Sequence, residues 1–204
     1  MVKSQLDHLF KIKDLGQLKF FLGLEVARSR KGIFLNQRKY TLELLDVVGL
    51  LGCKPSNTRM DPQIKLYSRK SHLLEDISMY RRLIEQLIYL TNTKPDICFA
   101  INNLSQFLSA PTMVHYQAAL RILRYLKVNP CRGLFFPSDS PLQLKDFCDS
   151  DQASCPETRR SITDFCIFLG DSLISWQSKK KHTFSRSFSS HFISFFVTTS
   201  LPYI

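Results

Sequence analysis

Three amphipathic helical segments follow one another between residues 78 and 127, and they restrict the fold more than any other feature of the chain. Apolar side chains recur at helical spacing in each segment, so each has one face to bury. Thr112 is positioned to cap the third segment. The predicted helices are Ser78–Leu90, Asp96–Leu108 and Met113–Lys127.

Strand-like sequence lies on both sides of these helices. Before them, Gln17–Arg28 and Gly32–Gln37 predict a β-hairpin, Arg38–Val48 predicts a further helix, and the proline-marked stretch Cys53–His72 predicts a loop. After them, the pattern changes near Asn129–Arg132 to short strands separated by turns. The fold class is therefore predicted to be α/β (α+β). The expected later strands are Gly133–Phe136, Leu142–Cys148, Ser161–Leu169 and Ser172–Trp176.

Composition limits the class of protein. The 204 residues are 44% hydrophobic, which is enough for a real core, and no apolar run approaches the roughly 20 residues that span a bilayer. Six cysteines are scattered without Cys-x-x-Cys pairs, and no apolar signal segment opens the chain. We therefore expect reduced thiols, no membrane partner and an intracellular location, in the cytoplasm or the nucleus.

The formal net charge of +11 favours an acidic partner, of which a nucleic-acid backbone is the commonest, although a solvated basic surface is an equal alternative. One group of cations recurs on the predicted outward face of the helix Met113–Lys127, and another is a lysine triplet. A solvated helix face and a surface strand end are the alternatives for these groups. The candidate nucleic-acid-binding residues are Arg121, Arg124, Lys127, Lys179, Lys180 and Lys181.

Several stretches carry a family resemblance that runs from about Leu6 to Ser187. They are KDLGQLKFFLGLEVARS (Lys13–Ser29), GIFLNQRKYTLELL (Gly32–Leu45), GLLGCKPSNTRMDP (Gly49–Pro62), YRRLIEQLIYLTNTKPDICFAINNLSQF (Tyr80–Phe107), ALRILRYLK (Ala119–Lys127), and then DFCDSD, RRSITDFCIFLG and SWQSKK. In this order they resemble the Pol polyprotein of copia-type retrotransposons.

The resemblance implies three segments. Residues 1–128 would be the C-terminal palm, thumb and connection part of a reverse transcriptase, with a remnant palm hairpin and a helical thumb. Residues 129–187 would be a partial RNase H-like domain with an incomplete mixed sheet, and residues 188–204 a non-matching tail. Phe21–Glu25 would stand where the palm approaches the primer terminus, with ordinary strand packing as the alternative.

Asp149 is the one candidate metal ligand that the resemblance implies, as the first carboxylate of an RNase H site. The surrounding motif departs from the family, with Gln152 in place of tryptophan, Ser154 in place of glycine, and Asp164 where a glycine usually stands. No acidic residue follows Asp171, and nowhere do two aspartates stand side by side as in the polymerase motif. Asp149 is therefore expected to be a vestigial ligand.

These observations predict a degenerate, catalytically inactive fragment of a Pol polyprotein. No cofactor is expected in this chain, whereas the ancestral enzyme would use Mg²⁺ in both of its catalytic centres. The alternative is a non-enzymatic basic protein that binds an RNA–DNA hybrid or another nucleic acid. A working nuclease is a third hypothesis, and the oligomeric state is left open.

Overall fold

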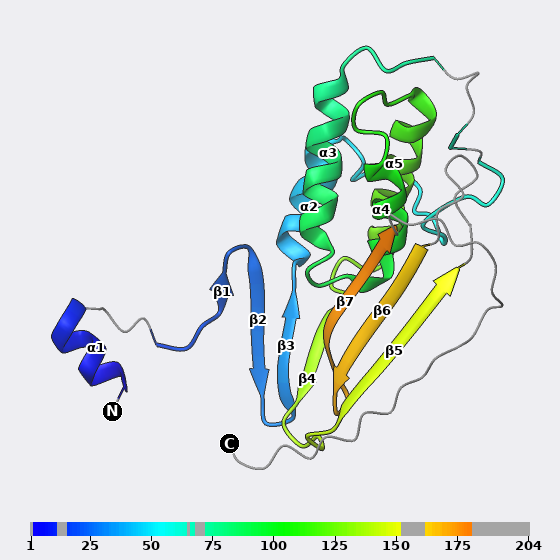
Figure 1. Cartoon of the computed structure of the whole chain (residues 1–204). Helices are drawn as coiled ribbons and strands as arrows, with labels where there is room; N and C mark the ends of the chain where they lie inside the picture. Colours follow the sequence, from blue (N-terminus) through cyan, green and yellow to red (C-terminus); the bar gives the residue numbers. More distant parts are fainter. Residues whose placement is uncertain (1, 12–15, 65, 68–71, 152–161, 181–204) are drawn as a thin grey trace.

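The structure, a computed structural model, describes residues 2–11, 16–64, 66–67, 72–151 and 162–180. Its helices are α1 (Val2–Phe10), α2 (Arg38–Val47), α3 (Ile77–Leu90), the 3-10 helix η1 (Pro95–Ile97), α4 (Cys98–Ser105) and α5 (Met113–Leu126). Its strands are β1 (Phe20–Phe21), β2 (Leu24–Ser29), β3 (Gly32–Asn36), β4 (Gly133–Pro137), β5 (Leu144–Asp151), β6 (Ile162–Leu169) and β7 (Ser172–Lys180). Helices α2 to α5 gather at one end of the strands, and α1 stands apart (Figure 1).

The predicted α/β class is confirmed, as are the helices. Among the described residues, no helix is long and apolar enough to cross a bilayer. The predicted cap at Thr112 is confirmed and extended, because Thr112 and His115 bond each other's backbone and side chain in a capping box. The second predicted helix begins as η1 before it continues as α4, as a proline at the first position allows. The predicted tail, residues 188–204, lies outside the described part.

The core lies between the helices. Leu45, Ile84, Leu87 and Ile122 are completely buried there, as the helical periodicity predicts. Tyr80 is also fully buried, and its hydroxyl group donates to the carbonyl oxygen of Leu104 at 2.8 Å. That bond joins α3 to α4 across the core and satisfies a polar atom that would otherwise be costly to bury.

The first sheet has the order β1-β2-β3-β4, with antiparallel neighbours throughout. The predicted hairpin is confirmed as β2 and β3, but the predicted run Gln17–Arg28 is not one strand. Leu22 and Gly23 both adopt positive φ angles, 48° and 76°, and the chain reverses there between β1 and β2. The apolar pattern hid this turn because a leucine occupies a left-handed position that such residues rarely adopt.

Strand β4 completes this first sheet, although it follows the change of pattern near residues 129–132. Leu134 pairs with Leu35 and Phe136 pairs with Ile33, so β4 bonds to the hairpin at the other end of the sequence. Gly32 allows the close approach, because a Cβ atom there would lie 2.1 Å from the carbonyl oxygen of Phe136. The two sheets therefore divide between Pro137 and Leu144.

The second sheet has the order β5-β6-β7, and all described pairs are antiparallel. The expectation of a mixed sheet is therefore wrong for the described strands. Gly170 and Asp171 alone join β6 to β7, and so short a connection can only join antiparallel neighbours. Strand β7 lies beside β4, so the two sheets meet edge to edge below the helices (Figure 1).

The segment Tyr89–Asp96, which we call the junction segment, joins the helices to both sheets. The side-chain amide of Gln37, just after β3, donates to the carbonyl oxygen of Tyr89 at 3.2 Å and accepts from the Thr93 hydroxyl group at 2.7 Å. The indole nitrogen of Trp176 on β7 donates to the carbonyl oxygen of Thr91 at 3.0 Å. One short connection therefore holds elements that are far apart in the sequence.

Lys94 is the most unusual member of the junction segment because its side chain is fully buried. Its ammonium nitrogen donates to the carbonyl oxygens of Pro130 and Arg132, at 2.9 and 2.8 Å. These carbonyls belong to the turn that leads from α5 into β4. Burial lowers the pKa of Lys94 to about 8, while the nearby Asp96 opposes this shift.

Replacing Lys94 should therefore destabilise the fold. We predict that Lys94→Met lowers the free energy of unfolding by about 2 kcal/mol, because it leaves two partly buried carbonyl groups without a donor. Chemical denaturation followed by circular dichroism measures this loss. Lys54→Met is the matched control, since Lys54 is exposed, and it should change the stability by less than about 0.5 kcal/mol. Equal effects of the two variants would contradict the role of Lys94.

The lowered pKa of Lys94 also predicts a pH dependence. Between pH 8 and 10.5 the unfolded lysine keeps a proton that the folded one has lost, so stability contributed by this site rises with pH. The neutral amine still has two N–H groups for its two carbonyl acceptors. The stability difference between the parent chain and Lys94→Met should therefore grow from pH 8 to 10.5. A stability difference that stays constant or shrinks over this pH range would show that folding does not lower the pKa of Lys94.

Candidate functional site

Asp149 lies near the end of β5 with an exposed side chain, directly opposite Asp164 on β6. Cross-strand partners project from the same face of a sheet, so the two carboxylates are neighbours. They border a cavity of about 310 Å³ between this face and the start of η1 and α4. Asp96 reaches the same cavity, and its apolar lining comes from Phe99, Phe147, Leu173 and Trp176.

The third carboxylate, Asp96, is already committed to a network. Its Oδ2 atom accepts from the Arg132 guanidinium group and from the Tyr125 hydroxyl group, each at 2.7 Å. The guanidinium group of Arg59 donates to the backbone carbonyl of Asp96 and lies 5.7 Å from the centre of the Tyr125 ring. Burial and the bond to Asp96 raise the pKa of Tyr125, and the charge of Asp96 raises the pKa of Arg132.

Among the described residues, two carboxylates at this cavity, Asp149 and Asp164, make no ion pair, and two are fewer than a two-metal centre uses. Within the described residues, no group of three or more His, Cys, Asp or Glu side chains is arranged to hold a metal ion. The sequence predicts Asp149 as the candidate ligand. It shows Asp164 only as a residue that differs from the family motif. The strand register reveals the pair, and the intervening residues 152–161, which include Gln152 and Ser154, lie outside the described part.

The cations of α5 do not form the free outward face that the sequence predicts. Arg121 lies 3.6 Å from the carboxylate of Asp61 and donates to the Thr58 hydroxyl group at 2.8 Å. Lys127 donates to the carbonyl oxygen of Cys53, and Arg124 is half-buried beside them. The prediction of an outward face is wrong because the proline-marked loop packs against this side of α5. A role in nucleic-acid binding stays a prediction for these three residues.

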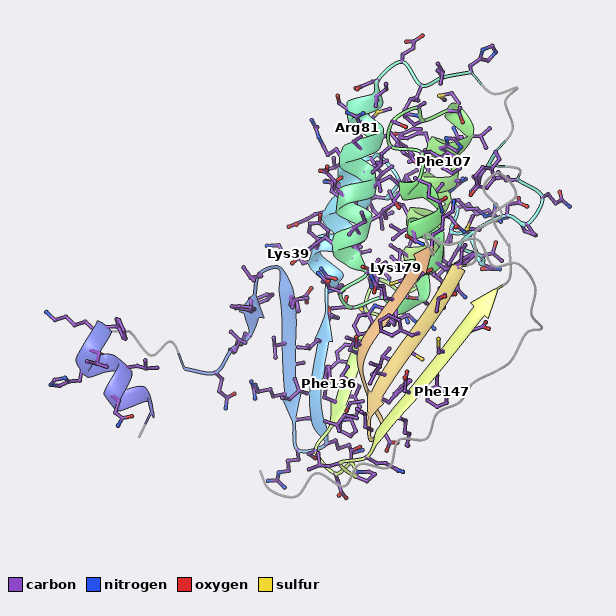
Figure 2. The ribbon with its side chains drawn as sticks, viewed as in Figure 1. Lys39, Arg81, Phe107, Phe136, Phe147 and Lys179 are labelled. Carbon is purple, nitrogen blue, oxygen red and sulfur yellow. The ribbon has the colours of Figure 1, made fainter. Side chains whose placement is uncertain are left out.

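The lysine triplet is divided by the alternation of β7. Lys179 is exposed at the end of the strand that reaches the helices (Figure 2). Lys180 points the other way, and its ammonium group donates to the side-chain oxygen of Gln106 at 2.8 Å. Lys181 lies outside the described residues. The triplet therefore supplies one described cation that is well exposed.

The cysteines of the described residues form no disulfide bond, and the expectation of reduced thiols stays a prediction; they are Cys53, Cys98, Cys131, Cys148 and Cys166. Burial raises the pKa values of Cys98 and Cys166, which makes both thiols less nucleophilic than an exposed thiol. Cys98, Cys148 and Cys166 all border the cavity beside Asp149. These thiols add to the apolar lining of the cavity. Cys155 lies outside the described residues.

The chain is similar to Pol polyproteins of plant transposons over nearly its whole length. It is 42% identical over 188 residues to the uncharacterized mitochondrial protein AtMg00810 of Arabidopsis thaliana, which covers 92% of this chain and 78% of that protein. It is 39% identical over 190 residues to the retrovirus-related Pol polyprotein from transposon RE1 of the same plant. The corresponding polyprotein from transposon TNT 1-94 of Nicotiana tabacum is 32% identical over 187 residues.

The chain belongs to the Pol family of copia-type retrotransposons. The match covers 92% of this chain but 13% of the RE1 polyprotein, and 87% of this chain but 14% of the TNT 1-94 polyprotein. It therefore corresponds to one short stretch of those Pol polyproteins. No protein-family profile matches the chain, and no solved structure matches it.

In this member of the Pol family, the carboxylate pair should weaken the second sheet. Like charges directly opposite each other on neighbouring strands repel, and the Oδ1 atom of Asp164 is buried without a hydrogen-bond partner in the described structure. We predict that Asp164→Asn raises the free energy of unfolding by about 0.5 kcal/mol. Thermal and chemical denaturation measure this gain.

Asp171→Asn is the matched control for that variant. Asp171 is exposed in the turn after β6 and lies 3.7 Å from the ammonium group of Lys145, so its removal should give no gain. Unchanged or lower stability of Asp164→Asn would show that the pair is not repulsive.

Proposed function

We propose that this chain is a catalytically inactive piece of a copia-type Pol polyprotein. In this proposal residues 1–128 derive from the palm, thumb and connection of the reverse transcriptase, and residues 129–187 from the RNase H domain. The remnant palm hairpin corresponds to β2 and β3, and the partial RNase H sheet to β5, β6 and β7. The observation that carries the loss of activity is the arrangement of carboxylates around Asp149.

Two-metal phosphodiester chemistry needs carboxylates that clamp two ions roughly 4 Å apart. Among the side chains that the structure describes, the acidic cross-strand neighbour of Asp149 is Asp164, whose position the family usually fills with glycine. The carboxylate of Asp96 borders the same cavity, but the Arg132 guanidinium group already neutralises it at 2.7 Å. A metal ion at Asp96 would share the carboxylate with that cation and be repelled by its charge, so Asp96 supports the fold in preference to a metal.

The sequence supports the same proposal. No acidic side chain follows Asp171, and the residues after Ser187 contain no glutamate that could act as the second ligand of the family's site. The chain also contains no pair of adjacent aspartates of the kind that holds the polymerase ions. If Mg²⁺ binds at all, Asp149 and Asp164 are the described residues that would contact it, together with water.

A second candidate function is non-enzymatic binding of nucleic acid, such as an RNA–DNA hybrid. The observation in its favour is the net charge of +11 on a chain whose family copies nucleic acid. Such a protein would act inside the cell, in the cytoplasm or the nucleus, where free thiols such as those described here are common. This function needs no metal centre and is therefore compatible with the loss of catalysis.

We predict that the full chain does not cleave an RNA–DNA hybrid. Incubation with a labelled hybrid and either Mg²⁺ or Mn²⁺ should give no more product than a reaction with a chelator. The Asp149→Asn variant should be indistinguishable from the parent chain in this assay, because a single surviving ligand contributes no rate enhancement.

Cleavage that depends on the metal and is lost in Asp149→Asn would overturn the proposal. Lys54→Asn serves as a control for a change at an exposed residue remote from the cavity. Cleavage that persists equally in all three proteins would come from a contaminating nuclease and would leave the proposal standing.

A further inference from the structure

Exposed positive charge gathers on the β2–β3 hairpin and in the segments directly before and after it, not on α5. Between Gly16 and Tyr40 the chain has six Lys or Arg side chains and a single acidic one, Glu25. This short stretch therefore has five of the eleven net positive charges of the chain. The cations are Lys19, Arg28, Arg30, Lys31, Arg38 and Lys39.

All six of these side chains are exposed. Lys39, at the start of α2 (Figure 2), lies 3.7 Å from Glu43, but both side chains are more than half exposed, so this ion pair is weak. The carboxylate of Glu25 accepts from the backbone nitrogen of Lys39 and makes no ion pair with a cation in the described structure. Among the described residues, the other five cations make no ion pair.

Three of them, Arg28, Arg30 and Lys31, lie at the turn between β2 and β3, and the backbone of this turn is fixed. Ser138, just after β4, donates from its backbone nitrogen to the carbonyl oxygen of Lys31 and from its hydroxyl group to that of Arg30, each at 2.9 Å. Gly32 is held against β4 as described above. The turn therefore presents its charged side chains from an ordered backbone, which lowers the entropic cost of binding.

The contrast with α5 identifies which cations are available to a partner. Arg121 and Lys127 already bond to the loop that covers α5, so a phosphate group would have to displace Asp61 and two oxygen acceptors. No such competition exists in the described structure at Arg28, Arg30 and Lys31. A surface cation that has no acidic partner loses only water when it meets a phosphate group.

We propose that the β2–β3 turn, through Arg28, Arg30 and Lys31, is the phosphate-contacting surface of this chain and binds the backbone of a nucleic acid. This inference rests on the second candidate function and names its site. A nucleic-acid strand presents one phosphate for about every 3.4 Å of helix axis, so a turn with three cations meets two or three neighbouring phosphates. Its contacts are to the backbone and therefore do not select a base sequence.

One acidic residue is the sequence neighbour of Ser138, which bonds to the turn. Asp139 follows Ser138 directly and is exposed. It reduces the local positive charge and should weaken the attraction for a phosphate backbone. Removing its charge is therefore a second test that alters no cation of the turn.

The test is a salt titration of binding to a labelled RNA–DNA hybrid, measured by fluorescence anisotropy with the full chain. The triple variant Arg28→Gln, Arg30→Gln, Lys31→Gln should bind at least about tenfold more weakly in about 50 mM salt than the parent chain. The slope of log affinity against log salt should fall by about 2 to 3, since each lost phosphate contact accounts for about 0.9. Asp139→Asn should bind more tightly than the parent chain.

The matched control is Lys11→Gln, Lys54→Gln, Arg82→Gln, which removes three exposed cations elsewhere and the same net charge. It should keep most of the affinity and of the salt slope. Equal losses in both triple variants would overturn the assignment to the turn while leaving nucleic-acid binding intact. A parent chain without salt-dependent binding would instead overturn the second candidate function itself. Thermal denaturation shows whether the variants are folded.

Discussion

The buried ammonium group of Lys94 is the interaction on which the arrangement of the two sheets depends. An ammonium group in an apolar interior is tolerated only where acceptors surround it, and here the carbonyl groups of Pro130 and Arg132 provide them. Those carbonyls belong to the turn before β4, so the bond sets where β4 enters the first sheet. Since β4 also lies beside β7, the position of the second sheet follows from the same contact.

In the junction segment, Asp96 both stabilises the fold and borders the cavity where a metal site would need a free carboxylate. Asp96 is two residues from Lys94, and its carboxylate holds Arg132 in place beside the turn that Lys94 also binds. Asp96 reaches the cavity next to Asp149, where a nuclease would need a further free carboxylate. A metal ion bound to this aspartate would share the carboxylate with the Arg132 guanidinium group and be repelled by its charge, so the structural use of Asp96 opposes a catalytic use.

The parts of the fold that the sequence predicts are those determined by neighbours along the chain. Helices α3 and α5 and the β2–β3 hairpin follow from periodicity, capping and turn residues, all within a few positions. Pairing of Leu35 with Leu134 could not be predicted, because it joins segments about 100 residues apart and depends on tertiary packing. The same holds for the Asp149–Asp164 pair, whose register depends on how β5 meets β6. Helical periodicity likewise cannot show which loop covers a polar helix face, as happens at Arg121.

Net charge alone therefore does not locate a binding surface in a basic protein. What matters is whether each cation already has an oxygen partner in its own chain, because a partner that must be displaced offsets the gain from a phosphate group. On α5 the covering loop supplies such partners, and in the junction segment Asp96 does so for Arg132. At the β2–β3 turn the backbone oxygens are bonded to Ser138 while the charged side chains stay exposed. Elsewhere in the fold, Arg121, Lys127 and Arg132 are bonded to oxygen atoms of the same chain. The cations of the hairpin turn are not bonded in this way in the described structure, so they are available to bind a phosphate group.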